Sequence, residues 1–188
     1  AKGKFLIEKI QKSDDSKTIK SINTIFYDIE MLTSKLLQRE KLNFAVLKKD
    51  KFKISSLILE SLSKLSIDDE SKVIVNIEND FDVEGDFYYL TIALKNLIDN
   101  AMKYAVEFPI VIESSKNEVY IKNISNKLSN DLIYYIQPFT REPNQAQGHG
   151  LGLNIVNKIL SLHEFKLKYK HEDSYNIFII CFNSNQIC

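Results

Sequence analysis

Hydrophobic residues in the N-terminal part of the chain recur every three or four positions, a spacing that predicts a long amphipathic helix. The recurring positions are Ile19, Ile22, Phe26, Ile29, Thr33 and Leu36. Alternating spacings of three and four form a heptad seam, and Ile25 and Leu32 widen its apolar stripe. Such a stripe needs a packing partner, because most helical stability comes from burying the apolar face.

A second helix is predicted just before this one. Residues 5–10 are rich in apolar side chains, and the polar segment 13–16 offers turn and N-cap residues. Residues 1–43 are therefore predicted to form a helical hairpin. Two hairpins can bury their seams against each other as an antiparallel four-helix bundle. The alternative is a monomer in which the seam packs against the rest of the chain.

Beyond residue 43 the apolar pattern alternates between the periods of strands and helices. Strands are predicted near 52–54, 73–77, 110–112, 119–124, 167–169 and 177–181, and helices at 57–65, 86–105 and from 151 onward. Polar pairs at 116–117 and 173–174 fit hairpin turns. The expected fold of residues 44–188 is a two-layer α/β sandwich, with helices on one face of a sheet and a linker at 42–51.

Composition narrows the choice of partners and compartment. The 25 basic and 25 acidic residues balance, so the chain has no net positive charge that would attract nucleic acid. In the lysine-rich runs at 48–53 and 166–170, lysines alternate with apolar residues, which is the pattern of strands with one solvent-exposed face. Cys181 and Cys188 fit a reducing compartment, and no apolar run approaches the roughly twenty residues of a membrane span. We expect no nucleic-acid partner and no membrane contact by this chain.

Three of the five glycines, Gly148, Gly150 and Gly152, lie within five residues, just before a run with helical spacing. Such a loop lets backbone N–H groups approach a ligand, and the helix dipole favours negative charge there. The pattern predicts a phosphate-binding loop. It lacks the glycine spacing of dinucleotide folds, the Gly-Lys-Ser/Thr of a Walker loop and the signature motifs of protein kinases. A glycine turn that only caps the helix is the alternative.

A second polar motif lies on the predicted helix at 86–105. Asn96 and Asn100 are four residues apart and share one helix face. Asparagine is unfavourable inside an exposed helix, so the pair suggests a function. Amide oxygens suit a Mg²⁺ ion held mainly by water and phosphate, and Lys103 adds a positive charge within a turn. A solvated polar stripe is the alternative interpretation.

The two motifs together resemble those of sensor histidine kinases. Residues 96–104 resemble the N box of that family, residues 148–153 resemble its G2 box, and Pro138-Phe139-Thr140-Arg141 matches its F box. Residues 83–86 are similar to the short turn that leads into the N-box helix. The resemblance covers nearly the whole chain in the expected order. It implies a Bergerat-type ATP-binding fold at 44–188, preceded by a dimerisation and histidine-phosphotransfer hairpin at 1–43 that forms a homodimer through residues 5–42.

The resemblance also implies ATP and Mg²⁺ as ligands and assigns site residues. Those implied to bind the nucleotide are Asn96, Asn100, Lys103, Tyr104, Asn123, Phe139, Arg141, Gly148, Gly150, Leu151 and Gly152. Asn100 is implied to hold the metal ion. Asn96, Lys103 and Arg141 are implied to take part in catalysis. The planar guanidinium group of Arg141 is implied to face the negative charge of the terminal phosphate.

One segment departs from the family. The adenine-binding box usually has the pattern D-x-G-x-G, in which the aspartate accepts a hydrogen bond from the adenine amino group. Residues 123–128 have neither glycine, and Asn123 stands in place of the aspartate. A neutral amide accepts a weaker hydrogen bond than a carboxylate does. An ordinary strand end and turn is the alternative for this segment.

The resemblance implies transfer of the ATP γ-phosphate to a protein histidine, followed by relay to the receiver domain of a response regulator. The family's acceptor histidine lies on the first hairpin helix, whereas the histidines here are His149, His163 and His171. We therefore expect a catalytic core that begins just after its phosphorylation site and cannot autophosphorylate alone. The expected setting is the cytoplasmic part of an inner-membrane protein. A degenerate nucleotide-binding module, and an ATPase or serine-directed anti-sigma kinase, are the alternatives.

Overall fold

A computed structural model describes residues 16–65, 67, 69–141 and 149–182. The chain divides into two compact units, 1–44 and 45–188. The predicted helix at 5–10 and most of the predicted turn at 13–16 lie outside the described residues.

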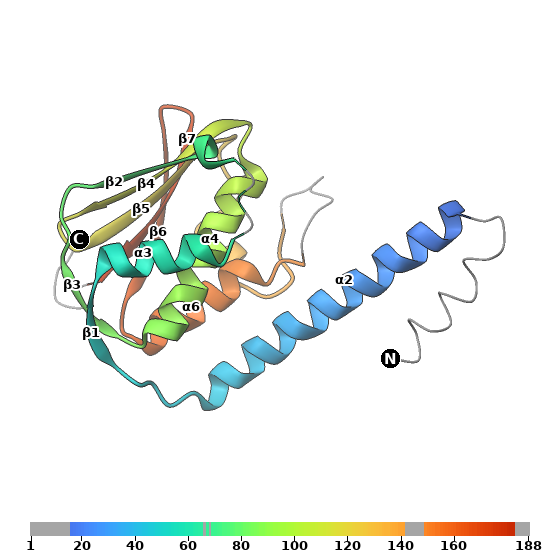
Figure 1. The fold of residues 1–188 in the computed structure, drawn as a ribbon, viewed down its shortest axis with the longest axis horizontal. Coiled ribbons are helices and arrows are strands. Elements are labelled where there is room, and N and C mark those ends of the chain that lie inside the picture. Colours follow the sequence, from blue (N-terminus) through green and yellow to red (C-terminus); the bar gives the residue numbers. More distant parts are fainter. Residues whose placement is uncertain (1–15, 66, 68, 142–148, 183–188) are drawn as a thin grey trace. The chain divides into compact units, whose positions relative to one another are not determined.

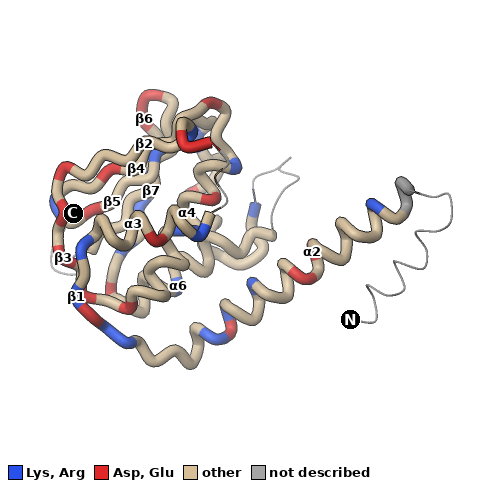
Figure 2. Tube along the Cα trace, viewed as in Figure 1, with Lys and Arg blue, Asp and Glu red and all other residues tan. Residues whose placement is uncertain are grey.

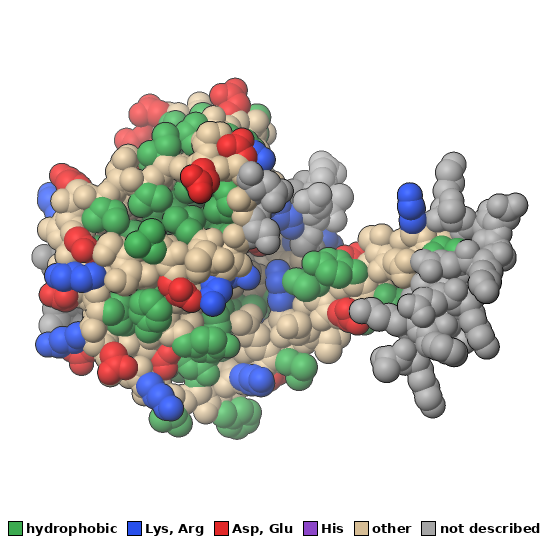
Figure 3. Space-filling model, in the orientation of Figure 1, with side chains coloured by type: hydrophobic (Ala, Val, Ile, Leu, Met, Phe, Trp, Pro, Cys, Tyr) green, Lys and Arg blue, Asp and Glu red, His purple; other side chains and the backbone are tan. Residues whose placement is uncertain are grey.

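The predicted amphipathic helix is confirmed in the first unit as α2 (Ser16–Lys41), which is followed by a short 3₁₀ helix, η1 (Leu42–Phe44). The middle of its apolar stripe is accessible in the single chain, with Ile25 57% and Ile29 54% exposed, whereas Ile19 near its start is buried. Figure 3 shows hydrophobic side chains on the surface of this helix. An apolar stripe of this kind is what a partner helix would cover.

A five-stranded sheet forms one layer of the second unit. Its order is β2 (Val73–Ile77), β4 (Glu107–Ser115), β5 (Glu118–Ile124), β7 (Tyr175–Cys181) and β6 (Lys166–Glu172). β2 and β4 run parallel, and the other neighbours run antiparallel. Both predicted hairpin turns are confirmed. Lys116 and Asn117, like Asp173 and Ser174, have positive φ, the geometry of two-residue type I′ turns.

Helices form the other layer of the predicted two-layer sandwich, which is confirmed (Figure 1). The longer ones are α3 (Ile54–Ser63), α4 (Phe87–Tyr104) and α6 (Gly152–Leu162), and α5 (Leu132–Tyr135) is a single turn. One face of each central strand is buried beneath them, as Ile112, Ile121 and Ile180 illustrate. Figure 2 shows basic and acidic residues interspersed along the described chain, in agreement with the balanced composition.

A two-stranded sheet corrects three predictions. β1 (Asp50–Lys53) pairs antiparallel with β3 (Asp82–Gly85), so residues 83–85 are a strand, although a turn was expected. The predicted linker at 42–51 includes the start of β1. The short strand expected at 52–54 is present, but it ends at Lys53, and Ile54 begins α3. The pairing joins segments about thirty residues apart, and a four-residue strand has too short a pattern to reveal such a partner.

The position of α4 matters because this helix carries Asn96 and Asn100. Asp86 caps the helix as predicted, with its Oδ1 accepting from the Tyr89 N–H at 3.1 Å.

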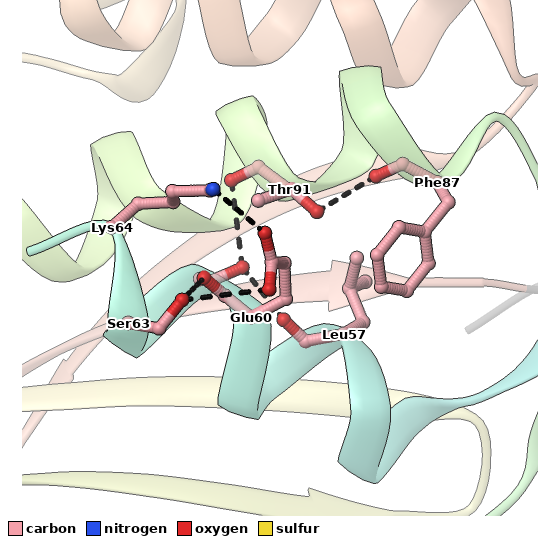
Figure 4. A network of polar contacts seen from close by, with 7 residues as sticks. Leu57, Glu60, Ser63, Lys64, Phe87 and Thr91 are labelled. Carbon is pink, nitrogen blue, oxygen red and sulfur yellow. Dashed lines mark hydrogen bonds and ion pairs between the residues drawn. The ribbon is translucent and has the colours of Figure 1, made fainter.

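α3 packs across α4. The buried Ser61 hydroxyl lies 2.7 Å from the Leu57 carbonyl and faces the Thr91 carbonyl at 3.5 Å. Figure 4 shows Thr91 donating in turn to the Phe87 carbonyl. These contacts hold the polar groups of the two helices together.

The start of α4 is also tied to the end of α6 through His163, which is 4% exposed. Its Nε2 accepts from the Asp86 N–H at 2.9 Å, and its Nδ1 lies 2.8 Å from the Ile159 carbonyl. A neutral ring with the proton on Nδ1 satisfies both contacts. Burial lowers the pKa of His163 and outweighs the opposing effect of the Asp86 carboxylate, and Lys49 lowers it further.

This pKa shift predicts that stability falls in acid. The unfolded chain binds a proton at His163 more readily than the folded chain, so the free energy of unfolding should fall as pH drops below about 6.5. The slope from this one group is at most about 1.4 kcal/mol per pH unit. Denaturant titrations at several pH values would measure it. His163→Gln should flatten the slope, and an unchanged slope would contradict the assignment.

Candidate nucleotide-binding site

Asn96 and Asn100 lie one turn apart on α4 and face the start of α6. A Cβ placed on Gly152 would lie 3.5 Å from both amide atoms of Asn100 and 3.6 Å from Oδ1 of Asn96. Asn96 also donates through Nδ2 to the Ile92 carbonyl at 2.8 Å, which holds its oxygen toward α6. The two motifs found in the sequence therefore converge at one place, with amide oxygens beside a helix N-terminus.

The N-terminus of α6 has no side-chain cap. Asp86 caps α4 through its carboxylate, whereas the N-cap residue of α6 is Leu151, which makes no side-chain cap hydrogen bond. The apolar residues of the run with helical spacing are all buried: Leu151, Ile155, Val156, Ile159 and Leu160. The backbone N–H groups of a first helical turn and the positive end of the helix dipole suit this helix start to a phosphate group.

Gly150 has a conformation that other residues rarely adopt. Its φ is +66°, and an added Cβ would lie 2.5 Å from the Thr140 carbonyl oxygen and 2.7 Å from the Phe139 carbonyl carbon. The Gly150 carbonyl accepts from the Phe139 N–H at 2.9 Å. The glycine therefore lets the segment after α5 cross the loop before α6 at close range. Gly148 lies outside the described residues.

Three more predicted site residues gather near the C-terminal end of α4. The Lys103 ammonium lies 5.1 Å from the centre of the Tyr104 ring. Burial raises the pKa of Tyr104, the Arg141 guanidinium partly opposes this, and Asp99 adds to it. Arg141 therefore lies close enough to the end of α4 to act on the same region as Lys103. Two cationic side chains at this end suit an anionic ligand.

Asn123 lies at the end of β5, next to the same part of α4. The Val106 N–H, two residues beyond the end of α4, donates to the Ile124 carbonyl at 2.8 Å. Asn123 is 2% exposed, and its Nδ2 has no hydrogen-bond partner in the described part of the chain. A buried donor without a partner costs about 1–3 kcal/mol, so a ligand that accepts from it would gain affinity.

A polar network missed by the sequence analysis supports the segment after Asn123. Asn176 donates through Nδ2 to the Asn126 carbonyl at 2.9 Å, and its Oδ1 accepts from the Tyr169 hydroxyl at 2.6 Å and lies 3.0 Å from Nδ1 of His171. The Tyr169 hydroxyl accepts from the Leu128 N–H at 3.0 Å. Side chains of the β6–β7 hairpin thus fix a segment in which the family's glycines are absent. Only the tertiary pairing of distant segments creates this contact.

The outer face of the sheet carries a hollow of about 370 Å³. Its two lysines are already paired, Lys122 with Glu113 and Lys170 with Glu172 at 2.6 Å. The hydrogen bond from Lys170 lowers the pKa of Glu172. Because its cations are neutralised and it lies on the face opposite the helices, this hollow does not suit a phosphate chain.

Comparison with known proteins identifies the family. Residues 85–185, more than half of the chain, match the family described as histidine kinase-, DNA gyrase B- and HSP90-like ATPases. The chain belongs to this ATPase family. The match begins at Gly85 and contains each site residue that the sequence predicted, from Asn96 to Gly152. The predicted ATP-binding fold and family resemblance are therefore confirmed.

Within the ATPase family, the curated relatives are sensor proteins. The chain is 32% identical to the sensor histidine kinase ArsS of Helicobacter pylori over 186 residues, which cover 95% of this chain and 42% of that protein. It is 25% identical to the heme sensor protein HssS of Staphylococcus aureus, covering 97% of this chain and 43% of that protein. The chain thus spans less than half the length of these relatives and corresponds to a histidine kinase ATPase catalytic domain.

Solved structures share the fold. The Acinetobacter baumannii histidine kinase AdeS matches with a TM-score of 0.69 and 20% identity, covering 90% of this chain and 86% of that one. Full-length ShkA in complex with AMPPNP matches with a TM-score of 0.70 and 15% identity, covering 91% of this chain and 40% of that one. The ATPase-family fold of this chain is therefore the one these kinases use.

The side chains present fit the ligands that the ATPase family implies. The start of α6 offers amides to a phosphate chain, and Asn100 offers a neutral oxygen to a magnesium ion whose other ligands are phosphate and water. Among the described residues, no three His, Cys, Asp or Glu side chains gather into a metal site of their own. No described helix is long and apolar enough to cross a membrane.

Proposed function

We propose that this chain is the catalytic core of a sensor histidine kinase and moves the γ-phosphate of ATP to a protein histidine. The observation that carries the proposal is the convergence of Asn96 and Asn100 on the N-terminus of α6, which has no side-chain cap. Both groups are amides, so neither can remove a proton from water. An incoming nucleophile that is already basic, such as an imidazole, suits this site better than water does.

In the proposed reaction an imidazole nitrogen forms a bond to the γ-phosphorus while the bond from phosphorus to the β–γ bridging oxygen breaks. ADP leaves, and the imidazole proton passes to solvent. The α6 amides would hold the phosphate chain, and Lys103 and Arg141 would stabilise charge on the phosphoryl oxygens. Bound Mg²⁺, with Asn100 among its ligands, would supply further charge neutralisation.

The wider roles are part of the same proposal. We propose that the phosphorylated histidine passes its phosphoryl group to the receiver domain of a response regulator. We also propose that this chain lies on the cytoplasmic side of an inner-membrane parent protein. The names of the curated relatives, a sensor histidine kinase and a heme sensor, and their more than twofold greater length support this setting.

Calorimetry with ATP and Mg²⁺ tests the binding step, and absence of heat at millimolar nucleotide would support the degenerate-module alternative.

Incubation with labelled ATP then tests the phosphotransfer step. Because residues 1–43 contain no histidine to act as the acceptor, this chain should remain unlabelled, whereas a chain that includes the acceptor histidine should carry acid-labile phosphate. Label on His149, His163 or His171 would overturn the proposed roles. Steady phosphate release by this chain alone would favour the ATPase alternative.

The α2 seam gives a separate prediction about assembly. We propose that residues 5–42 form a homodimer, because Ile25, Phe26 and Ile29 are about half exposed in the single chain. Ile22→Glu combined with Ile29→Glu would bury carboxylates without partners in the bundle, so light scattering should then report a monomer. Asp28→Ala together with Glu30→Ala, beside the seam, serves as the control and should leave the dimer mass unchanged. An unchanged mass for the Ile22/Ile29 variant would exclude this interface.

A further inference from the structure

Two buried asparagines lie opposite each other on the neighbouring strands β5 and β7. Within the described ranges, only one of them has hydrogen-bond partners for both its amide nitrogen and its amide oxygen. Asn123 pairs in register with Asn176. Asn176 uses both ends of its amide, donating to the Asn126 carbonyl and accepting from Tyr169. Asn123 is 98% buried, yet its Nδ2 has no partner among the residues that the structure describes. Native interiors rarely leave such a donor unpaired, so the group calls for an external acceptor.

The position of Asn123 determines which ligand can supply that acceptor. Its side chain shares the inner face of β5 with Val119 and Ile121, both buried beneath the helix layer. The backbone of the next residue, Ile124, bonds to the segment leaving α4, one turn from Lys103 and Tyr104. A nucleotide with its phosphates at α6 has its base as the remaining polar, planar group. The base edge is therefore the group that can reach this donor.

An amide recognises a base edge differently from a carboxylate. A carboxylate only accepts hydrogen bonds, whereas an amide offers one acceptor and two donors. Adenine presents an amino donor at position 6 next to the acceptor N1. Guanine and hypoxanthine present a carbonyl acceptor at position 6 next to an N1–H donor. Rotating the Asn123 amide by half a turn matches either arrangement, because its oxygen and nitrogen exchange places.

We propose that Asn123 makes this site accept 6-oxopurine nucleotides, those of guanine and hypoxanthine, about as well as adenine nucleotides. The inference rests on the proposed function, because it takes the site to bind a nucleotide. In this proposal the base contacts the Asn123 amide, which still has an unused donor. The Asn176–Tyr169–His171 network holds residues 126–128, the segment that follows Asn123, in place.

Displacement of a fluorescent ADP analogue by unlabelled ADP, GDP and IDP would test the proposal, since diphosphates avoid turnover. The dissociation constants of the unmodified chain for ADP and GDP should agree within about threefold. Asn123→Asp removes the donor and should weaken GDP and IDP relative to ADP by about tenfold. Lys122→Gln, next in sequence but on the opposite face of the sheet, is the matched control and should leave the ratio unchanged.

The outcomes separate this inference from the proposed function. If ADP binds and GDP binds more than about thirtyfold more weakly to the unmodified chain, the base inference is overturned and the kinase proposal stands. If no nucleotide displaces the analogue, both are overturned. If Asn123→Asp weakens all three nucleotides equally, Asn123 only supports packing and the inference also fails. The ratio in the unmodified chain decides the matter even if the variant does not fold.

Discussion

Replacing Asn100 with aspartate should slow phosphotransfer from Mg·ATP on the order of 100-fold, one of the two largest effects expected from a single change in this chain. The substitution retains an oxygen ligand but adds a negative charge beside the phosphates, where a neutral amide now faces the start of α6. The fold should survive, because Asn100 is only partly buried on α4. Single-turnover labelling of a chain that includes the acceptor helix would measure the loss.

Asn76→Asp is the matched control for this experiment. It adds the same charge at an exposed position on the edge strand β2, outside the site. Its transfer rate should equal that of the unmodified protein, which would show that charge alone does not cause the loss. Normal transfer by the Asn100 variant would remove this residue from the metal site and leave Asn96 as the remaining amide candidate.

Gly150→Ala should abolish most nucleotide binding while leaving the core of the domain folded. The new Cβ would lie 2.5 Å from a backbone oxygen and 2.8 Å from the Thr140 nitrogen, and the φ of +66° disfavours any side chain there. Backbone atoms cannot move aside as a flexible side chain can, so the loop must rearrange before α6. We expect nucleotide affinity to fall by at least about tenfold. Calorimetric titration with Mg·ATP would measure it.

Gly152→Ala provides the comparison two residues away. The nearest atoms to its Cβ outside the helix's own backbone would be those of the Asn96 and Asn100 side chains, at 3.5 Å or more, which is ordinary contact. Alanine also favours the helix that begins there, by up to about 1 kcal/mol. The melting temperature of this variant should therefore equal or exceed that of the unmodified chain. Equal affinity for nucleotide in Gly150→Ala and the unmodified chain would show that the loop tolerates a side chain and does not need its observed conformation.

The elements of the catalytic unit could largely be predicted because their signals are local. The hydrophobic period gives α4 and α6, Asp86 marks the start of α4, and the polar pairs at 116–117 and 173–174 mark type I′ turns. Each of these depends on residues within one or two turns of each other. Asn96 and Asn100 could be recognised for the same reason, since a spacing of four places two side chains on one helix face.

The arrangement of the site required tertiary structure. The pairing of β1 with β3 joins two short segments whose own patterns are too brief to identify a partner, so residues 83–85 resembled a turn. The approach of Gly150 to Thr140 and the support of residues 126–128 by Asn176 are contacts between segments that only packing brings together.

The difference is clearest at Asn123. The sequence by itself determined that an amide replaces the family's aspartate, and therefore that the hydrogen bond to a base would be weaker. The tertiary structure decided that this amide is buried on the inner face of β5 with its Nδ2 unpaired among the described residues, while its neighbour Asn176 has hydrogen-bond partners at both its nitrogen and its oxygen. The physical reason is that residue type fixes which donors and acceptors a side chain carries, whereas burial and neighbours decide which remain for a ligand.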